Sequence, residues 1–128
     1  MQLFFYGVLL EGLGEWPFLE GIGPGRRATT RGRLFGLRGT TGWYPALVPG
    51  DGLVIGAVHE AGMADIASMD AFEGVDYLRT PIQVEADGQQ IEANAYLWVS
   101  DLPDGSEHIS HGDFARWLAE SGRNPITG

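Results

Sequence analysis

The sequence predicts an α+β fold built around one small, curved and mostly antiparallel β-sheet. Its length of 128 residues is that of one domain with a single buried core. Segments with strand character outnumber those with helix character and do not alternate strictly with them, which argues against a doubly wound fold. Glycines gather near the ends of the expected strands, as in a sheet that curls into a barrel.

The first part of the chain predicts two strands separated by a loop. Residues 2–6 contain Leu3-Phe4-Phe5-Tyr6, an apolar run typical of a strand covered on both faces. A turn at Gly7 follows, and residues 12–25 are rich in glycine, which indicates a loop with one helical turn near Trp16 to Leu19. The second strand is expected at residues 30–37.

The middle of the chain predicts a loop, a strand and a helix. Residues 39–52 are rich in Gly, Thr and Pro and are expected to form a loop, whose apolar part, Trp43 to Val48, covers an edge of the core. Residues 53–60 are expected to form a strand, followed by a helix over residues 63–73. Three apolar residues share one face of that helix at three-residue spacing: Met63, Ile66 and Met69.

The last third predicts a hairpin and a second helix. Residues 82–86 and 91–99 alternate apolar and polar side chains, and Asp87-Gly88 between them is a hairpin signal. The final helix is expected to begin near Ser110 to Asp113, which resembles a capping arrangement, with Phe114, Trp117 and Leu118 on one face. We therefore expect one domain over residues 1–122 and a weakly held tail over 123–128.

Composition limits the partners and the compartment. The formal net charge is −9 and the pI is near 4.5, which argues against nucleic acid or an anionic membrane as a partner. The chain has no cysteine, which excludes disulfides and thiol nucleophiles and fits a reducing cytoplasm. Residues 1–10 are apolar, but they lack the basic start of a signal peptide and are too short to span a bilayer.

The basic residues are unevenly placed. All eight are arginine, and five of them lie between Arg26 and Arg38. This cluster could form a basic face for an anionic substrate. A solvated edge strand protected by charge is the more common use of such a cluster.

Several familiar catalytic motifs are absent from the sequence. Without lysine there is no Gly-Lys-Ser/Thr phosphate loop, and no Gly-x-Ser-x-Gly nucleophile elbow appears. The spacing of His108, His111 and Asp113 allows a metal site, but a capping loop with exposed imidazoles is the ordinary interpretation. His59 is expected to be an ordinary strand residue. We therefore expect neither a metal nor a cofactor.

The stretch from Met69 to Tyr77 carries the strongest chemical signal. Gly74 ends the expected helix, so Glu73 lies at the negative C-terminal end of the helix dipole. Apolar neighbours, beginning with Phe72, would also desolvate its carboxyl group. Both effects raise the pKa of Glu73 toward the range that suits proton transfer near neutral pH. The alternative on local sequence alone is a solvated glutamate at a helix end.

The turn after the first strand is the second candidate element. Tyr6-Gly7 opens a turn whose successive backbone N–H groups can form an anion-binding cradle. If the fold brings this turn to Glu73, the site combines a carboxylate-binding cradle with a proton shuttle. Such a site would suit a small zwitterionic substrate.

Seven short motifs follow one another in a characteristic order. They are Phe5-Tyr6-Gly7-Val8-Leu9, Gly32-Arg33-Leu34-Phe35, Tyr44-Pro45-Ala46-Leu47-Val48, Gly56-Ala57-Val58-His59, Met69-Asp70-Ala71-Phe72-Glu73-Gly74, Tyr77-Leu78-Arg79 and Gly112-Asp113. In this order, from residue 2 to about 118, the sequence resembles the gamma-glutamyl cyclotransferase-like family, including its avirulence-induced-gene-like branch. One position departs from the family pattern, because Val8 stands where the family has Thr or Ser.

The resemblance implies a small mixed β-barrel with flanking helices and an enzymatic activity. The reaction would cleave a γ-glutamyl amine or peptide by internal attack, giving 5-oxoproline and a free amine. Glu73 would be the general acid/base, and Tyr77 would lie near the pocket mouth. The implied substrate-binding turn comprises Tyr6, Gly7, Val8 and Leu9. We expect a small-molecule substrate, no nucleic acid or membrane partner, and a monomer or weak homodimer.

Two other classes of function remain open. Val8 favours a binding module that keeps the pocket without turnover, since one side-chain hydroxyl contact would be lost. A structural or partner-binding role would instead use the apolar loop from Trp43 to Val48.

Overall fold

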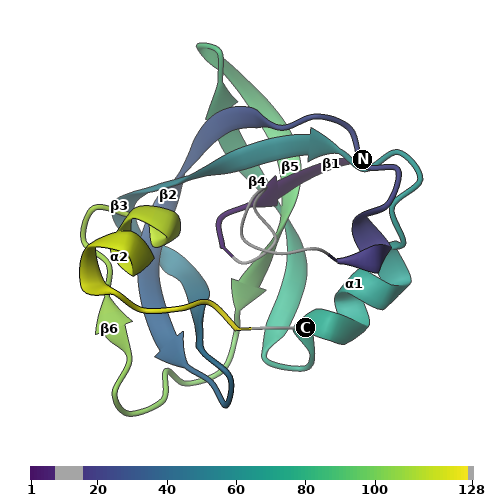
Figure 1. Ribbon diagram of the computed structural model, residues 1–128. Helices are drawn as coiled ribbons and strands as arrows, with labels where there is room; N and C mark the ends of the chain where they lie inside the picture. Colours follow the sequence, from purple (N-terminus) through teal and green to yellow (C-terminus); the bar gives the residue numbers. More distant parts are fainter. Residues whose placement is uncertain (8–15, 127–128) are drawn as a thin grey trace.

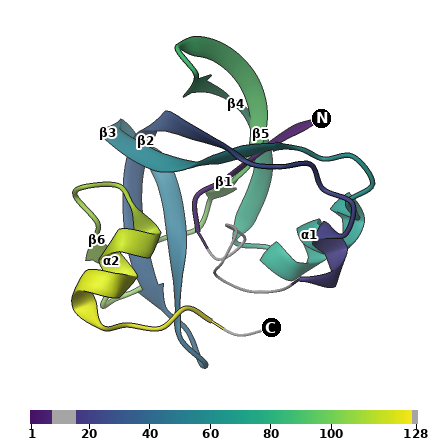
Figure 2. The ribbon, with the colours of Figure 1, turned by 45° about the horizontal axis from the view of Figure 1, so that its top comes forward.

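In the computed structural model, which describes residues 1–7 and 16–126, five strands close into a mixed barrel with a helix on either side (Figures 1 and 2). The barrel strands are β1 (Gln2–Phe5), β2 (Arg26–Arg38), β3 (Trp43–Glu60), β4 (Tyr77–Ala86) and β5 (Gln89–Trp98), and a short β6 (Glu107–His108) pairs with β2. The helices are the 3-10 turn η1 (Pro17–Leu19), α1 (Ile66–Glu73) and α2 (Phe114–Ser121). The predicted fold class is confirmed.

Strand β1 lies between β3 and β5 in the sheet. It pairs antiparallel with β3, where Phe4 lies opposite Val58, and parallel with β5, where Leu3 lies opposite Asn94. The other pairings between the named strands are antiparallel. Strand β1 is therefore central in the sheet, and Leu3, Phe4 and Phe5 are all buried, as expected for a strand covered on both faces.

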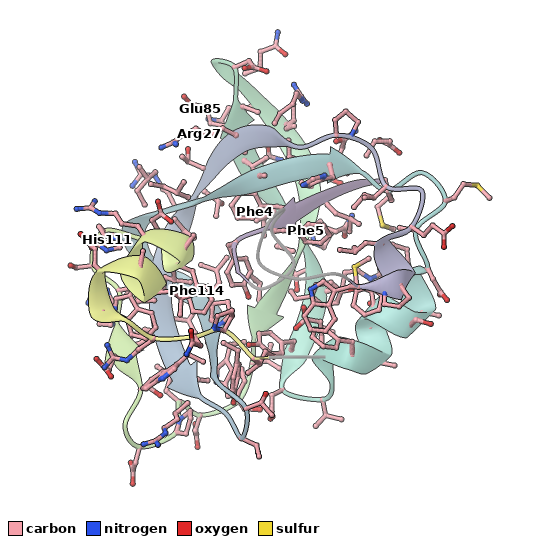
Figure 3. All side chains as sticks on the ribbon, viewed as in Figure 1. Phe4, Phe5, Arg27, Glu85, His111 and Phe114 are labelled. Atoms are coloured by element: carbon pink, nitrogen blue, oxygen red, sulfur yellow. The ribbon has the colours of Figure 1, made fainter. Side chains whose placement is uncertain are left out.

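The core fills the barrel interior and extends beneath α2. Phe4 and Phe114 are buried, whereas Arg27 and Glu85 lie on the outside (Figure 3). Because side chains alternate along a strand, β2 and β4 each give one set of residues to this core and one to the surface, whereas β1 buries both sets. Phe114 and Leu118 hold α2 against it.

The hairpin of β4 and β5 forms where the sequence predicted it. Asp87 and Gly88 have φ values of 52° and 76°, the conformation of the two-residue turns that match the twist of a hairpin. Strand β4 is longer than the predicted 82–86, because its pairing continues to Tyr77 opposite Trp98, while β5 begins two residues before the predicted 91–99 and ends one residue earlier. That extension brings the far end of the hairpin to the end of α1.

The prediction of a loop over residues 39–52 is wrong for most of that range. Only residues 39–42 form a connection, and β3 begins at Trp43. The segment from Trp43 to Val48 pairs with β2, and Ala46 and Leu47 are buried in the barrel wall. Pro49, Gly50 and Gly52, which suggested a loop, lie instead at the shift in register between β2 and β3.

Two further expectations are corrected. The arginines between Arg26 and Arg38 lie on β2, which is not an edge strand, because it pairs with β3 along its length and with β4 and β6 on its other side. Helix α1 begins at Ile66, capped by Asp65, and not at Met63. The side chain of Met63 is 86% exposed, so it shares no buried face with Met69.

The C-terminal segment is held more firmly than the sequence suggested. Helix α2 begins after Asp113, whose side chain accepts a hydrogen bond from the Arg116 amide, and ends at Gly122. Residues 124–126 then bond to the backbone of Trp43, so the expectation of a weakly held tail is wrong for them. Among the described residues, no helix is long and apolar enough to cross a membrane.

Candidate active site

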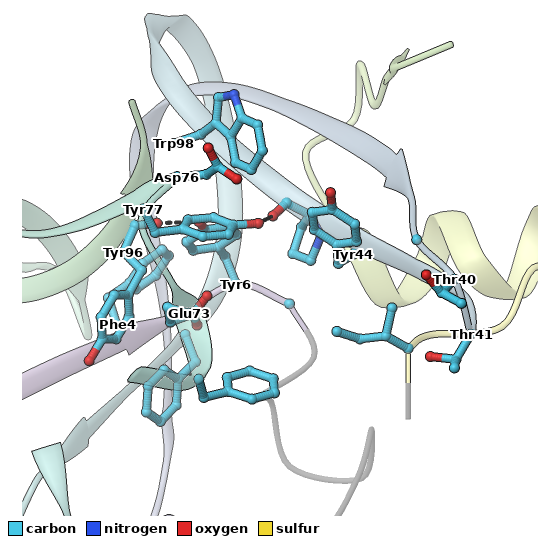
Figure 4. A pocket seen from close by; sticks show the side chains of 16 residues that line it. Phe4, Tyr6, Thr40, Thr41, Tyr44, Glu73, Asp76, Tyr77, Tyr96 and Trp98 are labelled. Carbon is cyan, nitrogen blue, oxygen red and sulfur yellow. Dashed lines mark hydrogen bonds between the residues drawn. The ribbon is translucent and has the colours of Figure 1, made fainter. Parts of the chain in front are cut away.

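A pocket of about 380 Å³ opens at the end of the barrel where β1, β3, α1 and β5 meet (Figure 4). Four of the predicted site residues line it: Tyr6, Gly7, Glu73 and Tyr77. The other two predicted residues, Val8 and Leu9, lie outside the described residues. The remaining lining residues are Phe4, Phe5, Gly39, Thr40, Thr41, Tyr44, Pro45, Phe72, Asp76, Tyr96, Trp98 and Ile126.

Glu73 is the last residue of α1, and its half-buried carboxyl group faces the pocket. Gly74 has a φ of 81°, a conformation that favours glycine, and so turns the chain away directly after the glutamate. The preceding Phe72 packs against the rings of Trp16 and Phe18, with centroids 4.6 and 5.3 Å away. This aromatic contact fixes the end of the helix and therefore the position of Glu73.

The Glu73 carboxyl group has an unusual electrostatic environment. Burial, and then the charge on Asp70, raise the pKa of Glu73 from 4.5 to about 8. Within the described part of the chain, no hydrogen bond or ion pair joins this carboxyl group to another residue. The sequence predicted the direction of the shift from apolar neighbours and the helix dipole, and the structure adds Asp70 as a cause.

Asp70 lies one turn earlier on α1 and has opposite surroundings. Its carboxylate accepts hydrogen bonds from Arg79 Nε at 2.9 Å and Arg79 Nη2 at 3.2 Å, and from the Tyr96 hydroxyl at 2.6 Å. The bonds from Arg79 contribute most to lowering the pKa of Asp70. Asp70 therefore stays ionised beneath Glu73 and disfavours a second negative charge there.

Two tyrosines form the inner wall. The buried Tyr6 hydroxyl donates a hydrogen bond to the Tyr96 carbonyl oxygen, and the Tyr77 hydroxyl donates one to the Pro45 carbonyl oxygen. Burial raises the pKa of both phenols, so both remain neutral. Their protons are already engaged by the backbone, which leaves Glu73 as the pocket-lining group placed to move a proton near neutral pH.

Gly7 and Pro45 bring two distant parts of the sequence together at the pocket floor. A Cβ atom at Gly7 would lie 2.0 Å from Pro45 Cγ, far inside any permitted contact. Only glycine allows the ring to lie this close to the first turn. The contact therefore holds Gly7, which follows the end of β1, against the start of β3.

The other residues singled out from the sequence lie away from this pocket. His111 contacts Glu120, with Nε2 3.1 Å from Oε1, and Asp113 caps α2. Among the described residues, no group of three or more His, Asp or Glu side chains is arranged to hold a metal ion. His59 is buried on β3, and its Nδ1 lies 2.9 Å from the Gly23 carbonyl oxygen.

Sequence reasoning missed several residues that shape the pocket. Asp70 could have been noted, because it precedes Glu73 by three residues, which places both on one side of a helix. Tyr96 and Trp98 are two residues apart on β5 and share one face, opposite the small core residue Ala95. Two aromatic residues on one face are a weaker signal of a pocket. Asp76 and Ile126 give no local signal, because their place in the pocket depends on the barrel as a whole.

Comparison with protein families identifies one match. The family described as "Gamma-glutamyl cyclotransferase, AIG2-like" matches residues 3–116, which includes the pocket residues contributed by β1, β3, α1, β4 and β5. No curated protein matches the chain closely enough to be counted as a relative.

Solved structures share the fold. YkqA from Bacillus subtilis is 26% identical with a TM-score of 0.72, over 94% of this chain and 42% of that protein. The chain thus spans less than half the length of YkqA. The protein ytfP from Escherichia coli is 27% identical with a TM-score of 0.63, over 94% of this chain and 99% of that one. An AIG2-like protein from Mus musculus, 23% identical with a TM-score of 0.61 over 80% of each chain, shares the fold.

Proposed function

This chain belongs to the AIG2-like gamma-glutamyl cyclotransferase family, and from that premise we propose that it cleaves a γ-glutamyl amide. In this proposal the α-amino group of the glutamyl part attacks its own side-chain carbonyl carbon. The products are 5-oxoproline and a free amine. Glu73 is the general acid/base, and the chemistry uses no cofactor.

One observation carries the proposal. The Glu73 carboxyl group faces the pocket with no hydrogen-bond partner among the described residues, and its pKa is raised to about 8. A structural carboxylate would ordinarily be paired, as Asp70 is with Arg79. An unpaired carboxyl group with a pKa near the working pH is suited to accept and return a proton.

The reaction balances without water. Glu73, in its ionised form, takes a proton from the α-ammonium group as its nitrogen forms the new bond to the γ-carbonyl carbon. The bond from that carbon to the amide nitrogen then breaks, and Glu73 returns the proton to the leaving nitrogen. A second proton passes from the attacking nitrogen to the amine, which leaves as an ammonium ion. Holding the folded-back conformer supplies much of the acceleration, because the attack is intramolecular.

Substrate binding is assigned to the turn after β1 and to the tyrosines. Backbone N–H groups of Tyr6, Gly7, Val8 and Leu9 would receive the α-carboxylate, as the sequence motif indicates. The Gly7–Pro45 contact supports this assignment, because it holds the start of the turn at the pocket. Tyr77 would bound the site on the side of β4. The absence of cysteine fits a reducing compartment, and we include a cytoplasmic location in the proposal.

A second candidate is a binding module that holds the same ligand without turning it over. The observation that favours it is Val8, which lacks the hydroxyl group that the family carries at this position. Incubation of the protein with γ-glutamyl methylamide, followed by chromatographic detection of 5-oxoproline, separates the two candidates. Catalysis predicts product in proportion to protein and time, whereas a module predicts saturable binding and no product.

A further inference from the structure

Half of the eight arginines have no counterion among the described residues, and all of these lie on β2. They are Arg27, Arg31, Arg33 and Arg38, and each is exposed. The others each contact an acidic side chain: Arg26 pairs with Asp87, Arg79 with Asp70, Arg116 with Glu120, and Arg123, which also contacts the rings of Trp43 and Trp117, pairs with Glu107. The unpaired positive charge of this acidic protein is therefore gathered on one strand.

The usual reason for arginines on a strand does not apply to β2. Charged side chains protect an exposed sheet edge from pairing with another chain. Strand β2 is covered by β3 along one edge and by β4 and β6 at two points of the other. Solubility does not explain these arginines either, because they bring the net charge of −9 closer to zero.

Three of the unpaired arginines lie on the outside of the barrel beside apolar residues of β3, as Arg27 does in Figure 3. In the register of the two strands, the pairs are Arg27 with Ala57, Arg31 with Leu53, and Arg33 with Val48. Side chains paired in this way are neighbours, and opposite charges would stabilise them. Here every partner is apolar, and Leu53 is 55% exposed. We call these residues the β2–β3 outer face.

Contacts at one end of this face hold Arg33 in place. The Phe35 ring lies 5.2 Å from the Arg33 guanidinium carbon and 5.2 Å from the ring of His108 on β6. The stem of Arg33 also packs on Gly50, where a Cβ atom would lie 2.4 Å from Arg33 Cγ. The aromatic ring beside the face is therefore already engaged by its neighbours, while Arg33 itself stays exposed.

The chemistry of the face suits a ligand that carries both carboxylates and apolar groups. Guanidinium groups bind carboxylates through paired hydrogen bonds, and Leu53 offers apolar area beside them. Two acidic residues lie beside the face, Asp51 in the bend of β3 and Glu85 opposite Thr29, but neither forms an ion pair with its arginines. Nucleic acid fits less well, because the net charge repels phosphates and single strands need free aromatic rings for stacking.

We propose that the β2–β3 outer face binds an acidic segment of a partner protein, in which apolar side chains lie between the carboxylates. The three arginines of the face bind the carboxylates, and Leu53 and Val48 contact the apolar side chains. None of these residues is among the described residues that line the pocket with Glu73, so this binding is independent of the proposed function.

Fluorescence anisotropy on the whole chain tests the proposal with two labelled peptides. The probe is a short peptide that repeats Glu-Glu-Leu, and the comparison peptide has Gln in place of every Glu. The acidic probe should bind about tenfold more tightly than the comparison peptide, the combined effect of three exposed ion pairs. The difference should shrink as salt is added, because exposed charges are screened. Equal affinity for the two peptides would overturn the proposal.

Matched variants locate the binding. Arg31→Glu should weaken binding of the acidic probe about fivefold or more, whereas Arg116→Glu, which changes the net charge equally on α2, should leave it within about twofold. Leu53→Ser should weaken it about two- to fivefold, since apolar contact is lost. Should Arg31→Glu fail to fold by thermal melting, Arg31→Gln should move the affinity in the same direction. An equal loss in Arg31→Glu and Arg116→Glu would reflect net charge alone and overturn the assignment of the face.

Other occupants of the face are outcomes of the same experiments. Tighter binding of a short oligo-dT strand, or of vesicles of equal parts phosphatidylserine and phosphatidylcholine, that Arg31→Glu abolishes would overturn the protein partner. A parent that sediments as a dimer and an Arg31→Glu variant that sediments as a monomer would assign the face to a second copy and also overturn it. Formation of 5-oxoproline should be the same in the parent and in Arg31→Glu, so catalysis is judged separately.

Discussion

Asp70 and Glu73 lie one helical turn apart on α1, yet their surroundings favour opposite protonation states. Arg79 and Tyr96 hold Asp70 as an anion, whereas burial and that same anion raise the pKa of Glu73 to about 8. A pair of carboxyl groups whose pKa values are driven apart is a common arrangement in acid/base catalysis.

Replacing Glu73 by glutamine should lower the turnover of γ-glutamyl methylamide about a hundredfold or more, the usual contribution of a general acid/base. Glutamine keeps the size of the side chain but cannot cycle a proton. Binding of 5-oxoproline should change much less. Formation of 5-oxoproline is measured beside Glu92→Gln, an exposed glutamate on β5 that should retain full activity. Equal activity in the two variants would remove Glu73 from the mechanism.

The pH dependence of kcat/KM should show an ionisation near pH 8, since only the ionised Glu73 can accept the proton. Below that point the rate should fall about tenfold per pH unit. Asp70→Asn removes the charge that opposes ionisation, so this limb should move to lower pH. The exposed Asp101→Asn is the control and should not move it. A limb that stays fixed in Asp70→Asn belongs to the substrate amine and not to Glu73.

Stability should fall as the pH rises from about 4.5 to about 8. The pKa of Glu73 is raised from 4.5 to about 8 by folding, so the folded protein holds this proton more tightly than the unfolded chain. The resulting stabilisation is complete below the lower value and is lost on passing the higher one. In urea unfolding, the free energy of unfolding of Glu73→Gln should therefore rise relative to that of the parent protein across this range, by on the order of a few kcal/mol. A constant difference between the two proteins would mean that Glu73 is not buried.

Gly7→Ala should destabilise the protein by about 1–3 kcal/mol, the usual cost of overpacking a buried contact. The new methyl group would lie 2.0 Å from Pro45 Cγ, so the turn after β1 or the start of β3 must shift. Gly23→Ala is the matched control, because its nearest contact would be an ordinary 3.4 Å. Urea denaturation that finds both variants equally stable would show that Pro45 does not restrain the turn.

Val8→Thr restores the hydroxyl group of the family motif and tests the binding-module alternative. If the parent protein is an active enzyme, the added hydroxyl should lower KM by about two- to tenfold, the worth of one hydrogen bond. Val8→Ala, which offers no hydroxyl group, serves as the control. A parent without activity and a Val8→Thr variant that forms 5-oxoproline would identify the parent as a binding module derived from an enzyme.

Signals within a few neighbouring residues were enough to predict part of this structure. Asp87-Gly88 specifies its turn through the backbone conformation that each residue tolerates, and the hairpin formed as expected. Gly74 likewise marked the end of α1 and so placed Glu73 at a helix terminus. In both cases the structure depends on the backbone conformations that one or two neighbouring residues tolerate, so it can be predicted from the sequence.

The remainder depends on contacts between distant segments. Trp43 to Val48 looked like a loop because Pro45 and the neighbouring glycines disfavour strands, but pairing with β2 and burial of Leu47 outweigh that preference. The partners of Arg123 come from β3, β6 and α2, so nothing near it in sequence signals that the tail is held. Such contacts exist only after the barrel has closed.

The position of β1 also sets the order in which the barrel can form. This strand pairs with residues 57–60 and with Asn94, so its pairing is complete only after most of the chain has been synthesised. Non-local and parallel pairings of this kind form slowly, because the conformational entropy of a long loop is lost before the stabilising contacts form. Strand β1 can pair with residues 57–60 first, but its other edge stays unpaired until Asn94 has been synthesised. The strand that leads into Gly7 therefore keeps an open edge, available for wrong pairings, until late in translation.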